Sequence, residues 1–462
     1  MGAPLLAEFA RSGDFRCEEE FKQTLVSYHR LRMPQTATVL ERGFLKNAIL
    51  LILGAVALLM VSNYVTGAIL LSFRPSDSDF SELYSSSWLW RHGHNPYDPE
   101  LATAARQQIV GATAPIFLVN VPTSLVLVAP FTLLPWGWAN LTFLIVGMVG
   151  LAVSIGLILL LRGSRWELGT AALVVFVLTF SPLRIAFQWG NVVILILPLS
   201  LLAIELAERA RDWPAGLLIG LAFCLKPQIG LWLAVYYLTR GRFKIIASAA
   251  TVAVFIAASF FLHPVPLSTL VASYRANMLH WFGPGGPYGF TNGSFTSLLL
   301  RTQGAFFRLT HSIAASNWMA HLLFLAGLIV WVTLQRRGML RIPPTLAISA
   351  LWSLSFLSIY HSVPDAAVLL IALCDVFPGS RLWTMGQKLA VAVLFLMMLP
   401  QRSILVFLSR HVSESVARGW WWDLFVARYM VWLLVALSVA LLFRMREVQR
   451  PTAAVVPGTK TS

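Results

Sequence analysis

Long apolar runs separated by short polar turns recur along almost the whole chain. A helix that crosses a bilayer needs about 20 apolar residues, and fewer where neighbouring helices shield its ends. The runs between residues 167 and 239 are short, and two of them could form one broken hairpin. On this pattern we predict twelve membrane-spanning helices, near residues 46–73, 137–162, 167–183, 191–208, 213–225, 228–239, 243–262, 313–334, 343–360, 364–377, 387–408 and 424–443.

One further apolar stretch, residues 116–135, differs from the others in its proline content. It contains Pro122, Pro130 and Pro135, and proline removes a helical hydrogen-bond donor and kinks or ends a helix. We therefore expect a re-entrant or interfacial segment here, with a thirteenth span as the alternative.

The composition excludes most other classes of protein. Hydrophobic residues make up 57% of the 462 residues and charged residues 12%, with a mean hydropathy of +0.72, whereas soluble domains are about 25% charged. A soluble globule, a disordered chain and a small disulfide-rich scaffold are thereby excluded. The three cysteines lie far apart and indicate neither a disulfide framework nor a metal cluster. We predict an all-α polytopic membrane protein.

The formal net charge of +15 is informative through the positions of the basic residues along the chain. In a soluble protein it would favour nucleic acid binding, but in a polytopic membrane protein basic loops fix the orientation, so no nucleic acid partner is expected. Most Lys and Arg fall in the two tails and in short loops on the same side, such as RGSR at 162–165 and TRGRFK at 239–244. Both termini are therefore predicted to be cytoplasmic.

This orientation divides the chain into three parts. Residues 1–45 form a polar cytoplasmic segment, residues 46–445 a transmembrane domain, and residues 446–462 a disordered cytoplasmic tail.

Polar side chains gather on the opposite, outer side. Two outer loops are long, residues 74–115 and 263–311. Polar groups at membrane depth are costly unless they line a cavity or meet a partner, so the outer turns predict a wet cavity that opens outward. These turns carry Arg184, Gln188, Asn191, Lys226, Gln228, His361 and Asp365.

The first outer loop holds the candidate acid–base residues. Asp77 and Asp79 directly follow the first span; a carboxylate there can act as a general base or cap a helix. His92 and His94 form a His-x-His pair, which could bind a metal or belong to a polar loop that contacts substrate.

Two basic residues are candidates for binding an anion. Lys226 precedes Pro227 between two apolar runs, where it could meet a phosphate or extend its ammonium group to the interface. Arg301 allows the same two interpretations. His361 and Asp365 flank Pro364 at an outer turn, which fits a polar site or a capped tight turn.

At these residues the chain resembles the polyprenyl-phosphate-mannose-dependent mannosyltransferases of glycosyltransferase family eighty-seven, in the GT-C superfamily. The resemblance covers roughly residues 77–370. Two departures from the family pattern bear on which sugar is transferred. Gly190-Asn191 stands where the family usually has Gly-Gln, and Val119-Asn120-Val121 replaces an aromatic residue. The matching blocks are Asp79 with Tyr84 and Gly93-x-x-Pro96-Tyr97, the proline-marked segment from Val121-Pro122 to Leu134-Pro135, Gly190-Asn191, residues 215–231 (AGLLIGLAFCLKPQIGL), Asn292-Gly-Ser294 followed by Arg301, and Tyr360-His361 before Pro364.

The resemblance implies a GT-C-like bundle of about twelve transmembrane helices whose extracytoplasmic loops carry the site. It implies transfer of a sugar, most often mannose, from a polyprenyl-phosphate donor to a hydroxyl of a glycolipid or glycan, with inversion, at a bacterial plasma membrane. Asp79 would be the base, Lys226 and Arg301 would hold the donor phosphate, and His361 would bond the acceptor, Asp79 or the phosphate. No metal or cofactor is expected. Further candidate substrate contacts are Asp77, Tyr84, His94, Asn95, Tyr97, Gln188, Asn191, Gln228 and Asn292.

A transporter or flippase of a lipid-linked saccharide is the main alternative. Broken helices and a central lysine also suit transport. A transporter would be expected to show an internal repeat and intramembrane charges on several helices. The sequence shows no repeat of fixed period, and its polar groups cluster on one side, which favours the enzyme. An inactive partner of a cell-envelope complex is a third possibility, and the presence of Asp79 argues against it.

Overall fold

The computed structural model is helical, which confirms the predicted fold class. It describes residues 35–162, 167–283, 285–291, 299–338, 341–377, 383–417 and 419–449. Within these ranges the only β-type pairing is an isolated bridge between Leu299 and Ser362. The chain divides into two compact units, Met1–Val56 and Ala57–Ser462. All the contacts discussed below lie in the second unit.

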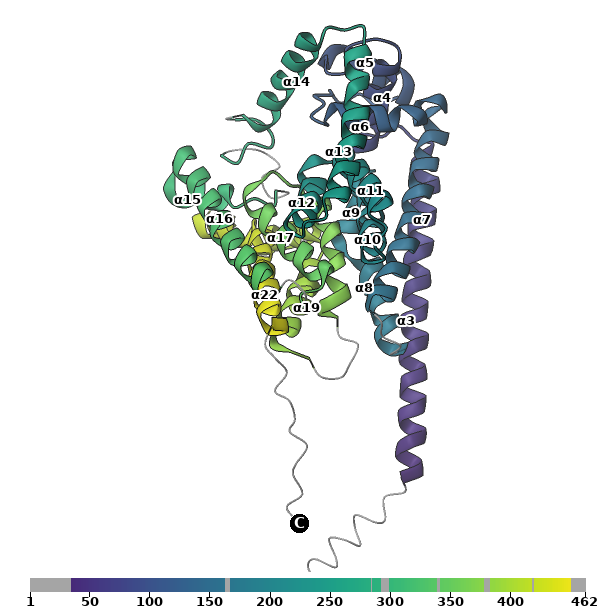
Figure 1. Cartoon of the computed structure of the whole chain (residues 1–462), viewed down its shortest axis with the longest axis vertical. Helices are drawn as coiled ribbons and strands as arrows, with labels where there is room; N and C mark the ends of the chain where they lie inside the picture. The colour runs from purple at the N-terminus through teal and green to yellow at the C-terminus, as the bar shows by residue number, and fades with distance from the viewer. Residues whose placement is uncertain are drawn as a thin grey trace, which may run out of the picture. The chain divides into compact units, whose positions relative to one another are not determined.

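The described helices follow one another with short connections (Figure 1). Their bounds are α3 Gln35–Ser72, α4 Asp79–Arg91, α5 Pro99–Val110, α6 Pro122–Val128, η1 Ala129–Leu133, α7 Trp136–Arg162, α8 Glu167–Thr179, α9 Ser181–Gln188, α10 Val193–Glu208, α11 Asp212–Leu225, α12 Pro227–Thr239, α13 Phe243–Ala258, η2 Ser259–Leu262, α14 Leu267–Phe282, α15 Gln303–Thr310, α16 Ile313–Arg337, α17 Pro344–Ser358, η4 Val363–Ala372, α18 Leu373–Val376, α19 Met385–Met397, α20 Gln401–His411, α21 Glu414–Ala417, η5 Trp422–Val426 and α22 Tyr429–Gln449.

Four helices in the described part of the chain are long and apolar enough to cross a membrane by themselves. The pair Leu168–Thr179 and Ser181–Trp189, bent by 44°, would add a fifth crossing if it forms one span. The predicted count of twelve is therefore not confirmed. The four helices cover Phe44–Leu70, Trp136–Arg162, Phe243–Leu262 and Ile313–Arg337, close to four of the predicted spans.

Several other predicted spans are short helices that the protein buries partly or, for α17, almost wholly. α10, α11, α12 and α17 have 16, 14, 13 and 15 residues, which at 1.5 Å per residue makes each roughly 20–24 Å long. Every residue of α17 from Thr345 to Ser358 is buried. Hydropathy alone does not separate a short buried helix from a short span, because both are apolar on all sides.

The proline-rich stretch at residues 116–135 also folds as a short element. Its apolar helix covers Pro122–Leu133, about 18 Å at the helical rise, which is less than the roughly 30 Å of a hydrocarbon core. This length fits a re-entrant or interfacial segment better than a thirteenth span.

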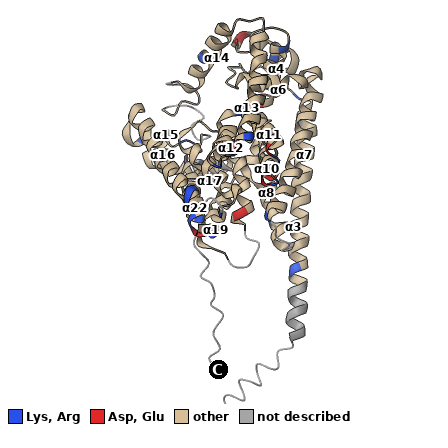
Figure 2. Cartoon of the chain, in the orientation of Figure 1, with Lys and Arg blue, Asp and Glu red and all other residues tan. Residues whose placement is uncertain are grey.

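Charged residues are sparse over the helices and collect at helix ends (Figure 2). Basic residues occupy the last turns of α16 and α22, namely Arg336, Arg337 and Arg446. These two helix ends lie together, since the Gln449 side-chain amide donates to the Leu334 carbonyl at 2.6 Å. In Figure 1, α4 and α14 lie at the other end of the bundle.

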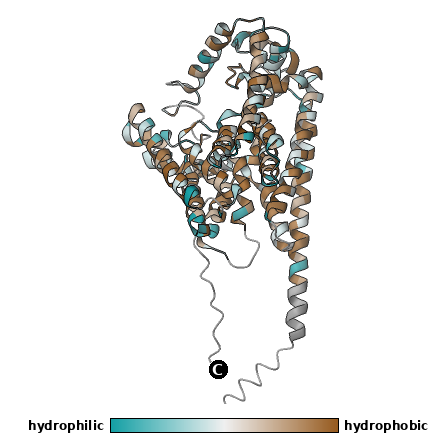
Figure 3. Ribbon diagram, in the orientation of Figure 1, coloured by the Kyte–Doolittle hydropathy of each residue, from teal (hydrophilic) through white to brown (hydrophobic). Residues whose placement is uncertain are grey.

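The long helices consist mostly of hydrophobic residues (Figure 3), and many of their apolar side chains are exposed. Exposed examples include Val149 on α7, Phe255 on α13 and Ile329 on α16. A soluble protein rarely exposes contiguous apolar surface on this scale, so these faces are suited to lipid.

Two prolines create the helix breaks that shape the site. Pro182 has no N–H to donate to the Leu178 carbonyl four residues earlier; the Tyr64 hydroxyl donates to that carbonyl instead, at 3.1 Å. Pro227 begins α12 directly after Lys226, whose backbone is extended (φ −154°, ψ 91°). The helical path is therefore interrupted at Lys226, and its side chain emerges between two helix ends.

Residues 1–34 and 450–462 lie outside the described residues. They include most of the predicted N-terminal segment 1–45 and of the predicted tail 446–462, so these boundaries stay a prediction.

Candidate active site

A cavity of about 330 Å³ lies where α4, the α9–α10 turn, the α11–α12 break and α14 approach one another. It contains two acidic residues, Asp79 and Glu82, and one basic residue, Lys226. Its lining residues are Asp79, Glu82, Leu83, Val119, Asn120, Val121, Trp189, Gly190, Asn191, Val192, Leu225, Lys226, Pro227, Gln228, Tyr274, Met278, Trp281, Phe282, Tyr288, Ile359, Tyr360 and Ser362. Four predicted site residues are thus brought together: Asp79, Asn191, Lys226 and Gln228.

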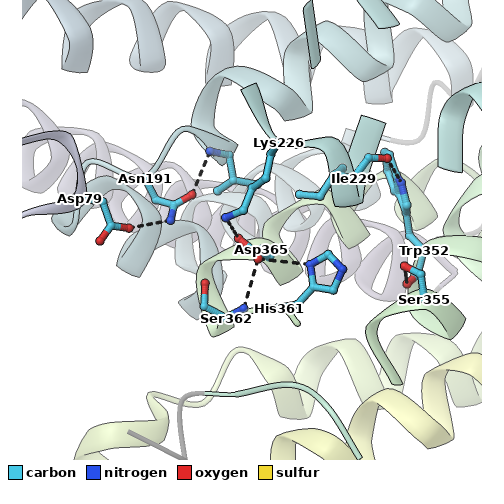
Figure 4. A network of polar contacts seen from close by, with 10 residues as sticks. Asp79, Asn191, Lys226, Ile229, Trp352, Ser355, His361, Ser362 and Asp365 are labelled. Carbon is cyan, nitrogen blue, oxygen red and sulfur yellow. Dashed lines mark hydrogen bonds and ion pairs between the residues drawn. The ribbon is translucent and has the colours of Figure 1, made fainter. Parts of the chain in front are cut away.

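Asp79 is held at the first turn of α4 by the α9–α10 turn. Its backbone N–H donates to the Trp189 carbonyl at 2.8 Å, and its carboxylate accepts from the Asn191 amide at 2.7 Å (Figure 4). Gly190 permits this contact, because its φ of +60° is left-handed and a Cβ there would lie 2.7 Å from the Cβ of Phe80.

Lys226 has a buried acidic partner. Its ammonium group donates to Asp365 at 2.5 Å, and the other oxygen of this carboxylate accepts from the Ser362 backbone N–H at 3.1 Å and contacts Nδ1 of His361 at 3.2 Å. Figure 4 shows Asp365 between the two basic groups. Asp365 and His361 have no exposed side-chain surface, whereas 14% of the Lys226 side chain is exposed. Lys226 therefore faces the cavity, while Asp365 and His361 lie behind it.

Glu82 is a second cavity acid that sequence reasoning missed. It lies three residues after Asp79 on α4, so the two side chains share a helix face, and 29% of its side chain is exposed. Arg106, itself buried, approaches Glu82 at 3.6 Å. Burial, and then the nearby Asp79 carboxylate, raise the pKa of Glu82 to about 8. The signal for Glu82 in the sequence was its i, i+3 spacing from Asp79, which places both acids on one helix face.

The pKa of Asp79 is also raised, and burial is the main cause. The hydrogen bond from Asn191 and the positive charge of Lys226 act in the opposite direction. A carboxyl group whose pKa is raised is a stronger base once it is ionised.

Aromatic side chains form one wall of the cavity. α14 and the turn after it supply Trp281, Phe282 and Tyr288, and Tyr360 meets them from the far side, with the Phe282 and Tyr360 ring centroids 4.4 Å apart. Flat aromatic faces of this kind pack well against the apolar C–H faces of a ring. Sequence reasoning missed this wall.

Arg301 supports the aromatic wall and does not line the cavity. Its guanidinium donates to the Tyr288 carbonyl at 2.6 Å and lies over the rings of Phe290 and Tyr360, at 5.1 and 5.9 Å. Only 9% of the residue is exposed, and burial lowers its pKa to about 10.

Asn95 and Tyr97, two further predicted substrate contacts, instead connect helices. The Asn95 amide donates to the Ser273 hydroxyl on α14 at 2.9 Å. The Tyr97 hydroxyl donates to the Asn120 carbonyl at 2.9 Å. These residues hold α14 and the segment before α6 around the cavity.

Asp77 and Tyr84 also lie outside the cavity lining. Asp77 is 58% exposed and pairs with Arg106 at 3.1 Å. Tyr84 is buried, and its hydroxyl donates to the Leu134 carbonyl at 2.8 Å. Both residues brace the α4 region against its neighbours.

The remaining predicted residues lie elsewhere. His94 is exposed and is not part of the cavity. Gln188 lines a separate, smaller cavity. Asn292 falls outside the described residues. The described residues contain no group of three or more His, Cys, Asp or Glu side chains arranged to hold a metal ion.

Comparison with known proteins identifies the family. No curated protein matches the chain significantly. The sequence model of glycosyltransferase family 87 matches residues 117–362, more than half of the chain. The matched region contains Asn191, Lys226 and His361, and Asp79 precedes it. The chain belongs to glycosyltransferase family 87.

Proposed function

We propose that this glycosyltransferase moves a sugar, with mannose the expected one, from a polyprenyl-phosphate donor to a hydroxyl of a glycolipid or glycan. The reaction would take place on the extracytoplasmic face of a bacterial plasma membrane and invert the configuration of the sugar. The observation that carries the proposal is one cavity lined by both Asp79 and Lys226. Glycosyl transfer needs a base for the acceptor and positive charge for the departing phosphate.

Asp79 is the proposed general base. The acceptor oxygen attacks the anomeric carbon while its proton passes to the Asp79 carboxylate, and the bond from that carbon to the phosphate oxygen breaks with its electron pair. Burial raises the pKa of Asp79, which increases its proton affinity. The Asn191 amide occupies one carboxylate oxygen and orients the other for the acceptor.

Lys226 is the proposed partner of the leaving phosphate. An ammonium group has three N–H donors, and the contact with Asp365 uses one of them. The others are available to an anion in the cavity. Asp365 would hold the ammonium in place, and the contact of His361 with Asp365 supports a positioning role for His361. Arg301 would act through the aromatic wall and not on the phosphate directly.

The basic helix ends support the proposed orientation. Arg336, Arg337 and Arg446 lie in the last turns of α16 and α22, and basic residues favour the cytoplasmic side. α4, which carries Asp79, lies at the other end of the bundle (Figure 1). This arrangement fits cytoplasmic termini and an extracytoplasmic site.

The test is transfer by the purified full-length protein in liposomes. The protein would be given polyprenyl-phosphate mannose and a lipid extract from its host, and mass spectrometry would detect a product heavier by one hexose. Asp79→Asn should lower turnover by about 10²–10⁴-fold, the usual contribution of a general base. Glu100→Gln, a change at an exposed residue of α5, is the matched control and should be active.

The proposal distinguishes three results. A product formed by wild type and Glu100→Gln but not by Asp79→Asn supports both the transferase and its base. Near-normal turnover of Asp79→Asn removes Asp79 from that role. Folded wild-type protein that transfers neither mannose, glucose nor arabinose from polyprenyl-phosphate donors contradicts the proposed donor class.

A further inference from the structure

A second cavity, of about 110 Å³, lies between α3, α7 and α9. It shares no lining residue with the candidate active site. Its lining residues are Met60, Asn63, Tyr64, Gly67, Ala68, Leu144, Arg184, Phe187 and Gln188. Three of them, Asn63, Arg184 and Gln188, are polar side chains contributed by otherwise apolar membrane-capable segments.

The polar groups of this second cavity have a net positive charge and free donors. Among the described residues of the lining, Arg184 alone is charged. In the described part of the chain its guanidinium has neither an ion pair nor a hydrogen bond, and the side-chain amides of Asn63 and Gln188 are likewise without protein partners. The Tyr64 hydroxyl is already used by the Leu178 carbonyl.

The depth of the cavity follows from its place on two neighbouring helices. Asn63 lies seven residues before Leu70, where the first apolar helix ends, and Leu144 lies eight residues after Trp136, where the next begins. At 1.5 Å per residue both are about 10–12 Å from these ends. The two ends are adjacent, because the Phe73 and Trp138 ring centroids are 5.6 Å apart. Each helix is about 40 Å long, some 10 Å longer than a typical hydrocarbon core. With this excess shared between the two ends, the cavity lies just inside the boundary between headgroups and acyl chains.

Arginine at this depth is costly unless it meets a partner. We propose that the second cavity binds the phosphate headgroup of a membrane lipid, with Arg184 pairing with the phosphate and the amides of Asn63 and Gln188 donating to it. A guanidinium fits phosphate oxygens in a two-bonded geometry.

A lipid is favoured over free phosphate because apolar faces flank the cavity. Val65 and Ile69 on α3 and Ile145 on α7 are exposed beside it, where acyl chains can lie. The site also adjoins the active site through α9: Gln188 lines the second cavity, and the next residues, Trp189, Gly190 and Asn191, line the first. The inference goes beyond the proposed transferase and does not depend on it.

The test is lipid binding by the full-length protein, stripped of lipid in detergent and followed by native mass spectrometry. Phosphatidylglycerol is the probe, and diacylglycerol and inorganic phosphate are separate arms. We expect Arg184→Gln to weaken phosphatidylglycerol binding about tenfold or more, as for loss of a charge-assisted contact. Asn63→Leu should weaken it less. Arg74→Gln, which removes the same charge from an exposed residue just beyond α3, is the matched control and should bind normally.

The three arms separate the outcomes. Saturable phosphatidylglycerol binding that both cavity variants weaken, with no comparable diacylglycerol or phosphate binding, supports the site. Equal binding by wild type, Arg184→Gln and Asn63→Leu overturns it, as does equal affinity for diacylglycerol. Tight binding of inorganic phosphate would replace the lipid by a free anion. Asn63→Leu keeps the test informative if Arg184→Gln fails to fold, because it places an apolar side chain on an exposed apolar helix.

Discussion

Asp79 and Asp365 are carboxylates of the same site with opposite surroundings. Asp79 lines the cavity, and among the residues that the structure describes its side chain has one hydrogen-bond partner, the neutral amide of Asn191. Asp365 is fully buried and meets an ammonium group, an imidazole and a backbone N–H. The first carboxylate has capacity left to accept a proton or a hydrogen bond from substrate, whereas the second is fully engaged by the protein.

This difference shows that environment, and not residue type, assigns the two acids their roles. An acid held by several donors stays ionised and fixes its neighbours, which suits Asp365 to positioning Lys226. An acid with one neutral partner and raised proton affinity suits proton transfer. The sequence around the two acids is similar, because each lies in a polar stretch next to apolar runs. Their different roles are therefore inferred from their contacts in the structure.

The largest expected effect comes from Asp365→Asn. This change leaves the Lys226 ammonium without its buried partner, and breaking a buried pair costs about 3–5 kcal/mol. We expect a large drop in thermal stability together with loss of transfer. Thermal unfolding of the purified protein in detergent, measured beside Asp79→Asn, gives the comparison directly: Asp79→Asn should stay near wild type in stability.

Removing both partners separates stability from function. Lys226→Met combined with Asp365→Leu replaces the ion pair by apolar groups and should regain part of the lost stability, while transfer from the polyprenyl-phosphate donor stays abolished. The rest stays lost, because the Ser362 N–H and His361 no longer have their acceptor. Full transfer by the double variant would show that Lys226 is structural only.

The fold class and the candidate residue Asp79 could be predicted from the sequence, because both depend on patterns of neighbouring residues. The long apolar runs correspond to α7 and α16, and Asp79 follows the first span at a recognisable spacing. The number of spans could not be predicted, because a helix can be apolar either to face lipid or to pack inside the protein. α17 is of the second kind, since its residues from Thr345 to Ser358 are all buried.

The partners of the site residues required the tertiary structure. Lys226 and Asp365 are separated by 139 positions, and no sequence spacing indicates that they pair. The aromatic wall is hidden for a similar reason, since α14 carries aromatic residues that could equally face lipid. Tyr97 matched a family pattern and Asn95 lies at an unspecified position within it, yet the side chains of both residues serve the packing of α14 and the segment before α6.

A smaller effect is expected on the pH dependence of transfer. The base must be ionised, so kcat/KM should fall as the pH drops through the pKa of Asp79. The Asn191 hydrogen bond lowers that pKa, and Asn191→Ala should therefore move the acidic limb to higher pH. Burial holds the pKa of Glu82 at about 8, so Glu82 is already protonated and uncharged over this limb, and Glu82→Gln should leave the limb in place.

These two variants form a matched pair because only Asn191→Ala should shift the limb. The measurement is kcat/KM across the pH range for both variants and wild type. An acidic limb that Asn191→Ala does not move, or that Glu82→Gln moves as far as Asn191→Ala does, would mean that a group other than Asp79 limits the reaction.

The smallest expected effect is that of a chelator. If a divalent cation lay between Asp79 and Glu82, the first carboxylate would be a ligand and its contrast with Asp365 would disappear. Lys226 already supplies positive charge to the same cavity. His92 is the histidine nearest to Asp79 in the sequence, and its Nδ1 is engaged with the Trp88 carbonyl at 2.8 Å. We therefore expect transfer by protein treated with EDTA to equal that of untreated protein. A loss of activity that Mg²⁺ or Mn²⁺ restores would instead make Asp79 a metal ligand, because a carboxylate bound to a cation is a poor acceptor for the proton of the substrate hydroxyl.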